Sequence, residues 1–328
     1  GRIQGALSEP FQLSGGEVYA SAAIGIATTY TSDPLVEELM RDANFALTSA
    51  RGVCASGVEL YVPHDHGQTR ERFRLEADLR RAIDAEELSL AFQPLVNLRS
   101  GKICGIEALS RWTAPDKGPV PPSTFIPLAE ESGLIVPLGR WTLMRACERL
   151  ADWRDRVPAA RTLNVAVNVS GVQLARDDIV EAVSAALDHS GLPGDALKIE
   201  LTESAIVRNP ERARRIFADL KALGCSIAMD DFGTGYSSLS YLQSLPIDIL
   251  KIDRSFVDGL LVSEDSRNIV TAILSLAEAL GMTTIAEGIE TEAQLTALRG
   301  AGCAIGQGYF LARPLDETAL IAELTEAG

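Results

Sequence analysis

Two adjacent carboxylates follow a short apolar segment of this chain. Asp230 and Asp231 come directly after the run 225–229, whose composition is typical of a buried strand. Neighbouring anions at such a place repel each other and lose hydration unless cations lie beside them. The pair therefore points to bound divalent metal ions.

The same arrangement, an apolar strand followed by a polar residue and then a helix, recurs along most of the chain. Strands are expected at 89–96, 103–108, 163–169, 197–201, 225–229, 249–252, 283–286 and 304–306. The clearest helices are expected at 137–153, 177–189, 210–223, 265–280 and 292–299. This alternation favours an α/β fold of the (β/α)8, TIM-like barrel type over an open doubly wound sheet.

In such a barrel, the functional groups lie at the carboxyl ends of the strands. The polar residues at these places are Glu107, Asn168, Glu200 with Glu203, Asp230 with Asp231, Lys251 with Asp253, Glu287 with Glu290, and Gln307. A single acid after a strand is more often a helix cap or a solvated loop residue. Its repetition at one strand end after another instead indicates a shared site.

Hydrolysis of a phosphate ester by two metal ions is the chemistry that this set suits. Hard divalent cations prefer oxygen ligands. Two of them about 3.5–4 Å apart can hold the attacking and leaving oxygens and activate a water molecule. Because the set contains no thiolate or imidazole, it favours Mg²⁺ or Mn²⁺ over Zn²⁺.

The motifs around these residues resemble those of a known family. They are Glu107-Ala108-Leu109-Ser110-Arg111-Trp112, Asn168-Val169-Ser170, Glu200-Leu201-Thr202-Glu203-Ser204, Asp230-Asp231-Phe232-Gly233-Thr234-Gly235, Lys251-Ile252-Asp253, Glu287-Gly288-Ile289-Glu290 and Gln307-Gly308-Tyr309. In this order and spacing they strongly resemble the EAL-domain cyclic-di-GMP phosphodiesterases, from about Thr69 to the C-terminus. Ser110 and Ile289 depart slightly from the usual family residues. The resemblance implies hydrolysis of cyclic-di-GMP to linear pGpG by water that two Mg²⁺ or Mn²⁺ ions activate.

The resemblance also implies roles for individual residues. The implied metal ligands are Glu107, Asn168, Glu200, Asp230, Asp231 and Glu287, with Asp230 bridging the two ions. The implied catalytic residues are Glu107, Asp231, Lys251, which contacts the nucleophilic water, and Glu287, a second-metal ligand or general base. Glu203 is expected to hold the loop 231–239 through a hydroxyl of that loop. Substrate contacts are implied for Gln93, Leu109, Arg111 and Gln307.

A smaller α/β fragment is expected before the barrel. A strand lies within 19–28, a helix begins at Asp33-Pro34 and runs through Ala50, and a second strand spans 57–62. This order resembles the last part of a GGDEF (diguanylate cyclase) domain without its signature half, so cyclase activity is not expected. The expected organisation is a partial GGDEF-like fragment at 1–63, a linker and helix at 64–87, and an EAL barrel at 88–328.

The connecting segment is expected to combine a polar turn with a charged helix. His64 and His66 have no third ligand nearby, so a solvated turn is favoured there over a metal site. An amphipathic helix is predicted over 69–87, and its apolar side carries Phe73, Leu75, Leu79 and Ile83.

Composition limits the partners of the chain and its setting. A net charge of −15 disfavours duplex nucleic acid, which binds basic surfaces, but leaves room for cyclic-di-GMP beside local metal ions. The odd number and wide spacing of the cysteines indicate free thiols in a reducing cytoplasm.

The chain is expected to come from a longer protein with upstream sensory domains, which could include a membrane anchor. A homodimer through the EAL barrel is also expected.

Two other functions compete with the enzyme. Relatives of this shape that have lost ligands only sense the dinucleotide, and an EAL-like barrel can also serve as a protein-docking scaffold. No ligand loss is visible in this sequence, which favours catalysis. Gly233 and Gly235 predict a mobile loop, so dimerisation or an upstream sensor could set whether Asp231 faces the metal.

Overall fold

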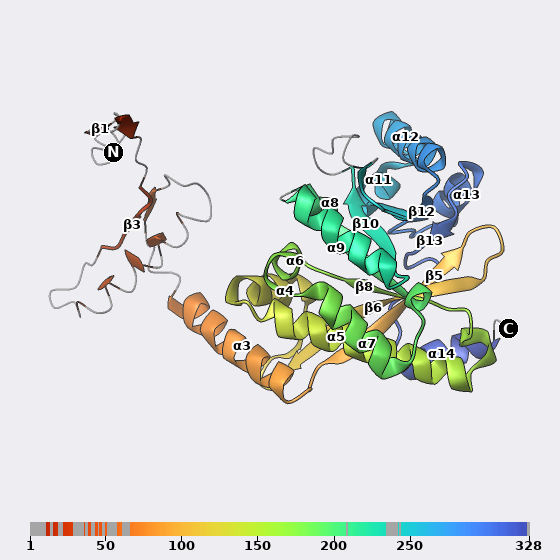
Figure 1. Ribbon diagram of the computed structural model, residues 1–328, viewed down its shortest axis with the longest axis horizontal. Helices are drawn as coiled ribbons and strands as arrows, with labels where there is room; N and C mark the ends of the chain where they lie inside the picture. Colours follow the sequence, from red (N-terminus) through yellow and green to blue (C-terminus); the bar gives the residue numbers. More distant parts are fainter. Residues whose placement is uncertain are drawn as a thin grey trace. The chain divides into compact units, whose positions relative to one another are not determined.

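The protein is described by a computed structural model, drawn in Figure 1. The described residues are 66–326 except 208, 234–241 and 243, together with 11–13, 16–18, 22–28, 58–60 and single positions between 36 and 50. The chain divides into two compact units, Gly1–Phe73 and Arg74–Gly328.

The second unit is a closed barrel. Its strands are β5 (Ser89–Asn97), β6 (Ile103–Ala114), β8 (Val165–Asn168), β9 (Leu197–Thr202), β10 (Ser226–Phe232), β11 (Ile249–Ile252), β12 (Thr283–Ala286) and β13 (Ile305–Gly306). They pair in the order β5-β13-β12-β11-β10-β9-β8-β6, and β6 pairs again with β5 to close the ring. The expected (β/α)8, TIM-like architecture is thereby confirmed.

Strand β5 runs antiparallel to both of its neighbours, β6 and β13. The other pairs in the ring are parallel. Only 98–102 connect β5 to β6, and so short a connection cannot carry the crossover helix that parallel strands require. The antiparallel register places Gln93 opposite Glu107 and Ser89 opposite Arg111. A further short strand, β7 (Gly118–Val120), pairs antiparallel with 112–114 at the end of β6.

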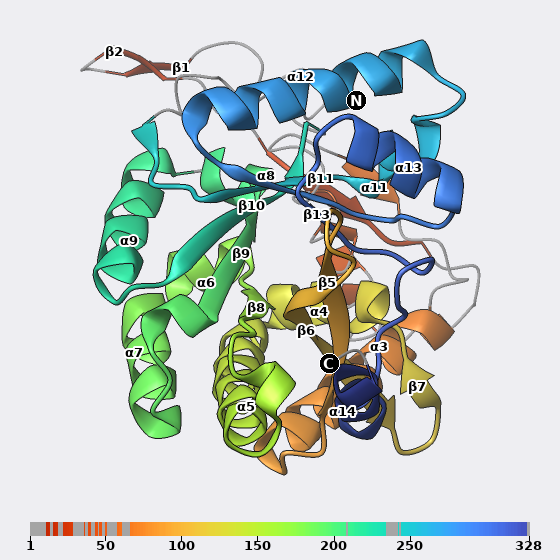
Figure 2. The same ribbon diagram turned by 90° about the vertical axis from the view of Figure 1, so that its right-hand side faces the viewer.

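Helices surround the strands, as Figure 2 shows. The five expected helices are α5 (Ile135–Arg156), α7 (Ile179–Ser190), α9 (Pro210–Ala222), α12 (Glu264–Leu280) and α13 (Glu292–Gly300). The additional ones are α4 (Pro122–Ser132), α6 (Gly171–Arg176), α8 (Glu203–Val207), α11 (Arg254–Gly259), α14 (Glu317–Glu326) and the 3-10 turns η2 (Pro158–Ala160) and η3 (Gly194–Ala196). Side-chain caps start α7, α9, α12 and α13 and satisfy backbone N–H groups there. None of the described helices has both the length and the apolarity needed to cross a membrane.

Two apolar layers hold the barrel together. Outward-facing strand residues such as Ile106, Val167 and Ile199 are buried beneath the helices. Inside the ring, a separate cluster packs Leu95, Ala228, Ile249 and Ile285, with Cys104 and Ile305 beside it. Strand side chains alternate between faces, so a residue two positions from an inner apolar residue also faces the barrel interior. The next layer of inward-facing side chains includes Gln93, Asp230, Lys251, Glu287 and Gln307. The polar layer therefore packs on the inner apolar cluster.

Helix α3 (His66–Asp84) connects to β5. Its residues Leu75, Leu79 and Ile83 are buried in a cluster that includes residues of β6 and α4. Phe73 is 66% exposed, so the expectation that it faces the apolar side is wrong. The turn expected at His66 is also wrong, because His66 is the first residue of α3. His64 lies outside the described residues.

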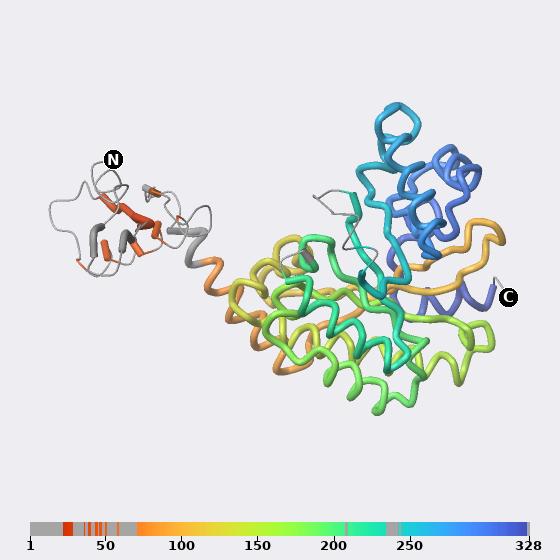
Figure 3. The backbone as a smooth tube through the Cα atoms, turned by 45° about the horizontal axis from the view of Figure 1, so that its top comes forward, coloured from red at the N-terminus to blue at the C-terminus, as the bar shows by residue number. Residues whose placement is uncertain are grey.

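The C-terminal segment packs against β5 and α5. Leu315 forms an antiparallel bridge with Phe92 of β5, and Figure 3 shows the blue end of the chain beside the orange β5. Glu317, at the start of α14, accepts a hydrogen bond from Trp153 Nε1 at 3.0 Å. These contacts attach α14 to β5 and α5.

The first unit contains two small sheets. Strands β1 (Phe11–Leu13) and β2 (Gly16–Val18) pair antiparallel. Strands β3 (Ile24–Ile26) and β4 (Val58–Leu60) pair in parallel, and described positions between 36 and 50 are helical. The described residues therefore give a strand, helical positions and a second strand in the expected order.

The cysteines that the structure describes are free. Cys147, Cys225 and Cys303 are buried and Cys104 is partly buried, whereas Cys54 lies outside the described residues. Burial raises the pKa of the thiols of Cys147 and Cys225 to about 12 and about 11. These thiols are inert, and the cytoplasmic setting expected from the cysteine pattern stays a prediction.

Candidate active site

Lys251 is the centre of the candidate site. Its Nζ lies 2.5 Å from Glu200 Oε2, 2.6 Å from Glu287 Oε1 and 3.3 Å from Asp230 Oδ2. A fourth carboxylate oxygen, Oε2 of Glu107, lies 3.9 Å away. Burial opposes the charged ammonium, but the four carboxylates outweigh burial and raise the pKa of Lys251 well above its ordinary value. Lys251 is therefore a permanent cation inside a cluster with surplus negative charge.

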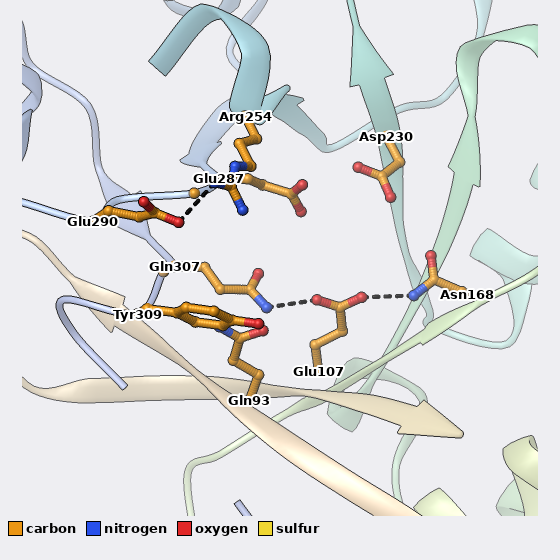
Figure 4. Close-up of a pocket in the computed structure, with 11 residues that line it drawn as sticks. Gln93, Glu107, Asn168, Asp230, Arg254, Glu287, Glu290, Gln307 and Tyr309 are labelled. Carbon is orange, nitrogen blue, oxygen red and sulfur yellow. Dashed lines mark hydrogen bonds and ion pairs between the residues drawn. The ribbon is translucent and has the colours of Figure 1, made fainter. Parts of the chain in front are cut away.

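Glu107 connects two amides to this cluster, as Figure 4 shows. Its Oε1 accepts a hydrogen bond from Asn168 Nδ2 at 2.6 Å, and its Oε2 accepts one from Gln307 Nε2 at 2.7 Å. The expectation that the strand ends at Ala108 is wrong, because pairing with β5 and β7 continues β6 to Ala114. Glu107 therefore lies in mid-strand and reaches the site from the inner face of the barrel.

Glu200 is the most deeply buried acid of the cluster. Its side chain is 0% exposed, and its Oε1 has no hydrogen-bond partner among the described residues. Burial raises the pKa of Glu200 to about 8, although the Lys251 ammonium opposes this change. A buried carboxylate oxygen without a donor is costly, so this oxygen is available to a cation.

Glu287 has a carboxyl pKa close to neutral pH. It follows β12 and faces the same space as Asp230 and Glu107 (Figure 4). Burial, together with repulsion from Asp230 and Glu107, raises the pKa of Glu287 to about 7 against the opposing effect of Lys251. Such a carboxyl can exchange a proton near neutral pH.

The oxygen donors of this layer fit hard divalent cations. Glu107, Glu200 and Asp230 bring carboxylates together, Asn168 adds an amide oxygen, and Glu200 Oε1 lacks another partner. Added positive charge would relieve the repulsion among the acids. In the part of the chain that the structure describes, no three acidic, His or Cys side chains form a preassembled metal site. The carboxylates point instead toward the Lys251 ammonium.

Asp231 has an unusual backbone conformation. Its φ is +54°, in the left-handed region, which Asp and Asn tolerate better than most residues. Its N–H donates to Asp230 Oδ1 at 2.9 Å. Burial, with repulsion from Asp230 and Asp253, raises the pKa of Asp231. Asp231 does not line the pocket described below, and its expected role as a metal ligand stays a prediction.

Glu203 holds the backbone just after Asp231. Its buried Oε2 accepts a hydrogen bond from the N–H of Gly233 at 3.1 Å. The expected partner was a hydroxyl of the loop, but 234–241 lie outside the described residues. The described contact fixes the start of the loop through its backbone.

The cluster opens into a pocket of about 300 Å³. It is lined by Gln93, Glu107, Asn168, Asp230, Arg254, Glu287, Gly288, Glu290, Gln307, Gly308 and Tyr309. Two of the four expected substrate contacts, Gln93 and Gln307, belong to this lining. Leu109 and Arg111 do not, because they lie further along β6 on the face that carries Glu107. Their contact with substrate stays a prediction.

Sequence analysis missed Arg254 as a pocket residue. Its Nη2 lies 2.7 Å from Glu290 Oε1, and Tyr309, under the guanidinium of Arg313, lines the same pocket. Arg254 was overlooked because a basic residue in the first turn of a short helix is usually solvent-exposed. Its position two residues after the end of β11 is the signal that could have identified it.

The closed β/α barrel and its lysine-centred cluster of acids define a TIM-like protein with oxygen donors gathered toward the carboxyl ends of its strands. Residues 76–314 match the EAL domain family. The chain belongs to this family.

Known proteins resemble the chain over most of its length. The bifunctional diguanylate cyclase/cyclic di-GMP phosphodiesterase MucR of Pseudomonas aeruginosa is 40% identical over 97% of this chain and 46% of that protein. The cyclic di-GMP phosphodiesterase PdeR of Escherichia coli is 36% identical over 97% of this chain and 48% of that protein. A solved structure of the PaMucR phosphodiesterase in complex with c-di-GMP is 42% identical, with a TM-score of 0.72, over 75% of this chain and 99% of the solved chain. The chain thus spans less than half the length of these two curated relatives.

Proposed function

We propose that this chain is a cyclic-di-GMP-specific phosphodiesterase that produces linear pGpG in a reaction that requires divalent metal ions. The observation that carries the proposal is the buried cluster of four carboxylates around Lys251 inside the barrel. Membership of the EAL family and similarity to proteins named as cyclic di-GMP phosphodiesterases support it.

The proposed metal ligands for two Mg²⁺ or Mn²⁺ ions are Glu107, Asn168, Glu200, Asp230, Asp231 and Glu287. Such ions, when bound, polarise the scissile phosphate and lower the pKa of the attacking water. The contribution of the chain is a dense set of oxygen donors on rigid strands. Lys251 keeps these donors from spreading apart, because its ammonium contacts Glu200 and Glu287 directly.

Lys251 and Glu287 are the proposed groups that act on the water. The buried Lys251 cation stabilises negative charge as it develops on the attacking oxygen. As the alternative to a role as second-metal ligand, Glu287 can accept the proton of the water, because its pKa of about 7 in the metal-free protein suits a general base. The water oxygen then bonds to phosphorus while the bond to the 3′ oxygen breaks. The 3′ oxygen takes up a proton and becomes a hydroxyl, which leaves a linear dinucleotide with a 5′ phosphate.

Four residues are the proposed substrate contacts. Gln93 and Gln307 line the pocket, and Gln307 is held by Glu107. Gln93 Nε2 donates to the carbonyl oxygen of Ala312 at 3.2 Å, which fixes its amide. Leu109 and Arg111 would meet the part of the substrate that extends along β6, and the planar guanidinium of Arg111 suits a phosphate.

The test is a separation of reaction products by chromatography. Purified protein is incubated with cyclic-di-GMP and Mg²⁺ or Mn²⁺ at several protein concentrations, and parallel samples contain EDTA. We expect pGpG with metal and none with EDTA. No turnover with either metal at any concentration would overturn the proposal. Calorimetric binding without turnover would then identify a silent receptor, and neither binding nor turnover would favour a docking scaffold.

Further parts of the organisation are proposals as well. The partial GGDEF-like fragment at 1–63, the linker and helix at 64–87 and the barrel from 88 are supported by the parallel pairing of β3 and β4 and by the position of α3. A homodimer through the barrel, sensory domains upstream in a longer protein and a cytoplasmic location are proposed with them. Sedimentation velocity of the purified chain tests the dimer.

A further inference from the structure

Arg254 holds its guanidinium at the rim of the pocket between two acids. Its Nη2 lies 2.7 Å from Glu290 Oε1, and its Nε donates to Asp258 Oδ2 at 3.1 Å. The side chain is 54% exposed, and Arg254, Glu290 and Glu287 all line the pocket. In Figure 4 the guanidinium lies between Glu290 and Glu287 and faces the open space.

The backbone at Gly288 makes room for the stem of Arg254. A Cβ added to Gly288 would lie 2.4 Å from Arg254 Cγ and 2.8 Å from Arg254 Cβ. Gly288 also has a φ of +69°, which L side chains rarely adopt. The stem therefore passes against the peptide next to Glu287, which fixes where the guanidinium can reach.

The charges around this guanidinium leave it able to bind an anion. Among the residues that line the pocket, Arg254 is the basic one, and the acids are Glu107, Asp230, Glu287 and Glu290. A guanidinium has five N–H donors in a planar fork. The described residues use one donor at Nε and one at Nη2 and give Nη1 no partner. The two acids thus orient the fork and leave donors for a ligand.

We propose that Arg254 binds the phosphate of cyclic-di-GMP that is not cleaved. This inference rests on the proposed function. The substrate carries two phosphates, and the buried carboxylates and their cations are needed by the scissile one. The second phosphate needs a separate cation, and a guanidinium fork can donate two parallel hydrogen bonds to its oxygens. Arg111 also suits a phosphate, but it lies outside the pocket lining, to which Arg254 belongs. Arg254 is therefore a specificity residue that favours a substrate with two phosphates.

The experiment compares Arg254→Gln, Arg254→Lys and a matched control, Arg267→Gln, whose arginine is exposed on α12 and lies outside the pocket lining. Initial rates of cyclic-di-GMP hydrolysis give kcat and KM for each protein at low and high NaCl. For Arg254→Gln we expect KM to rise about 10- to 100-fold with kcat within about twofold, as for loss of a charged hydrogen bond that ground and transition states share. Arg254→Lys should recover part of the loss, and Arg267→Gln should match the wild type.

Salt separates a phosphate contact from a structural role. The KM of the wild type should rise with NaCl more steeply than that of Arg254→Gln, because screening weakens a charge that the variant no longer carries. An unchanged KM in Arg254→Gln, or a fall in kcat alone, would overturn this inference while wild-type turnover preserves the proposed function. If the wild type has no turnover, the proposed function fails. Calorimetric titration with cyclic-di-GMP then decides whether Arg254→Gln binds it more weakly.

Discussion

Lys251 Nζ and Glu200 Oε2 lie 2.5 Å apart inside the barrel, where the two side chains are 1% and 0% exposed. Removing one partner of a buried ion pair leaves the other charge without compensation, at a cost of about 3–5 kcal/mol. Substitution of either side chain should therefore be costly, because it leaves a buried group without its partner.

Lys251→Met should unfold more easily and lose turnover. We expect the metal-free variant to lose about 3–5 kcal/mol of unfolding free energy, because four carboxylates then face each other without a cation. Urea unfolding measures this loss, and added Mg²⁺ should recover part of it. Lys102→Met, at an exposed position, is the control and should change stability by less than about 0.5 kcal/mol. Equal losses in both variants would contradict the prediction.

The metal-free protein should become less stable as pH rises from about 4.5 to 8. Glu200 and Glu287 have folded-state pKa values of about 8 and 7, against an ordinary value of 4.5. Between these values the folded state binds more protons than the unfolded state, so the unfolding free energy falls with rising pH. Urea midpoints in EDTA at pH 5, 6, 7 and 8 measure the slope. Glu200→Gln should reduce this dependence on pH. An unfolding free energy that rises with pH would contradict the prediction.

Asp231→Asn and Asp231→Ala should separate backbone strain from charge. Asn tolerates the φ of +54° and removes the charge, so Asp231→Asn should keep its unfolding free energy within about 0.5 kcal/mol and lose turnover. Asp231→Ala should also lose turnover and be destabilised by about 1–2 kcal/mol, because Ala is strained at this φ. Thermal unfolding and rate measurements check both. An Asn variant with wild-type turnover would remove Asp231 from the proposed catalytic set.

Gly288→Ala should cost more than the same change at a matched glycine. Gly101 has a φ of +73°, close to the +69° of Gly288, but an added Cβ there meets nothing within 4 Å. Both substitutions should show the strain of the left-handed backbone, about 1 kcal/mol. Only Gly288→Ala should also displace the Arg254 stem and raise KM for cyclic-di-GMP. Equal KM values in the two variants would show that the collision does not affect substrate binding.

Glu203 should act through its acceptor oxygen. Glu203→Gln keeps an oxygen that can accept the Gly233 N–H, whereas Glu203→Ala leaves that N–H without its partner. We expect Glu203→Ala to lower kcat by at least about tenfold and Glu203→Gln to retain most of it, at equal Mg²⁺ concentrations. Similar kcat values for the two variants would mean that this hydrogen bond does not position the loop.

The strands were predictable because each is a short apolar run with a polar residue beyond it. The reversed direction of β5 was missed, although five connecting residues, 98–102, already exclude a crossover helix. The mid-strand position of Glu107 was also missed, because the continuation of β6 beyond Ala108 depends on pairing with β5 and β7, which the composition of the segment alone does not show. The alternation of side chains still brings Glu107 to the site.

The buried acids of the site were predictable from strand ends, but the rim was not. Arg254 belongs to the pocket because Gly288 allows a close passage between two segments that are distant in sequence. The pattern of residues around Arg254 does not reveal that passage. The central position of Lys251 likewise depends on contacts with acids from four other strands or strand ends.

The reversed direction of β5 determines where the preceding chain meets the barrel. Since Ser89 lies opposite Arg111, the chain enters at the end of the barrel that carries the proposed catalytic side chains. A barrel built only from parallel strands would begin at the opposite end. Helix α3 packs in the same cluster as Trp112, the neighbour of Arg111. We therefore expect a shift of α3 along its axis to displace the end of β6 on the pocket side of the barrel. The inner cluster of Leu95, Ala228, Ile249 and Ile285 should stay in place.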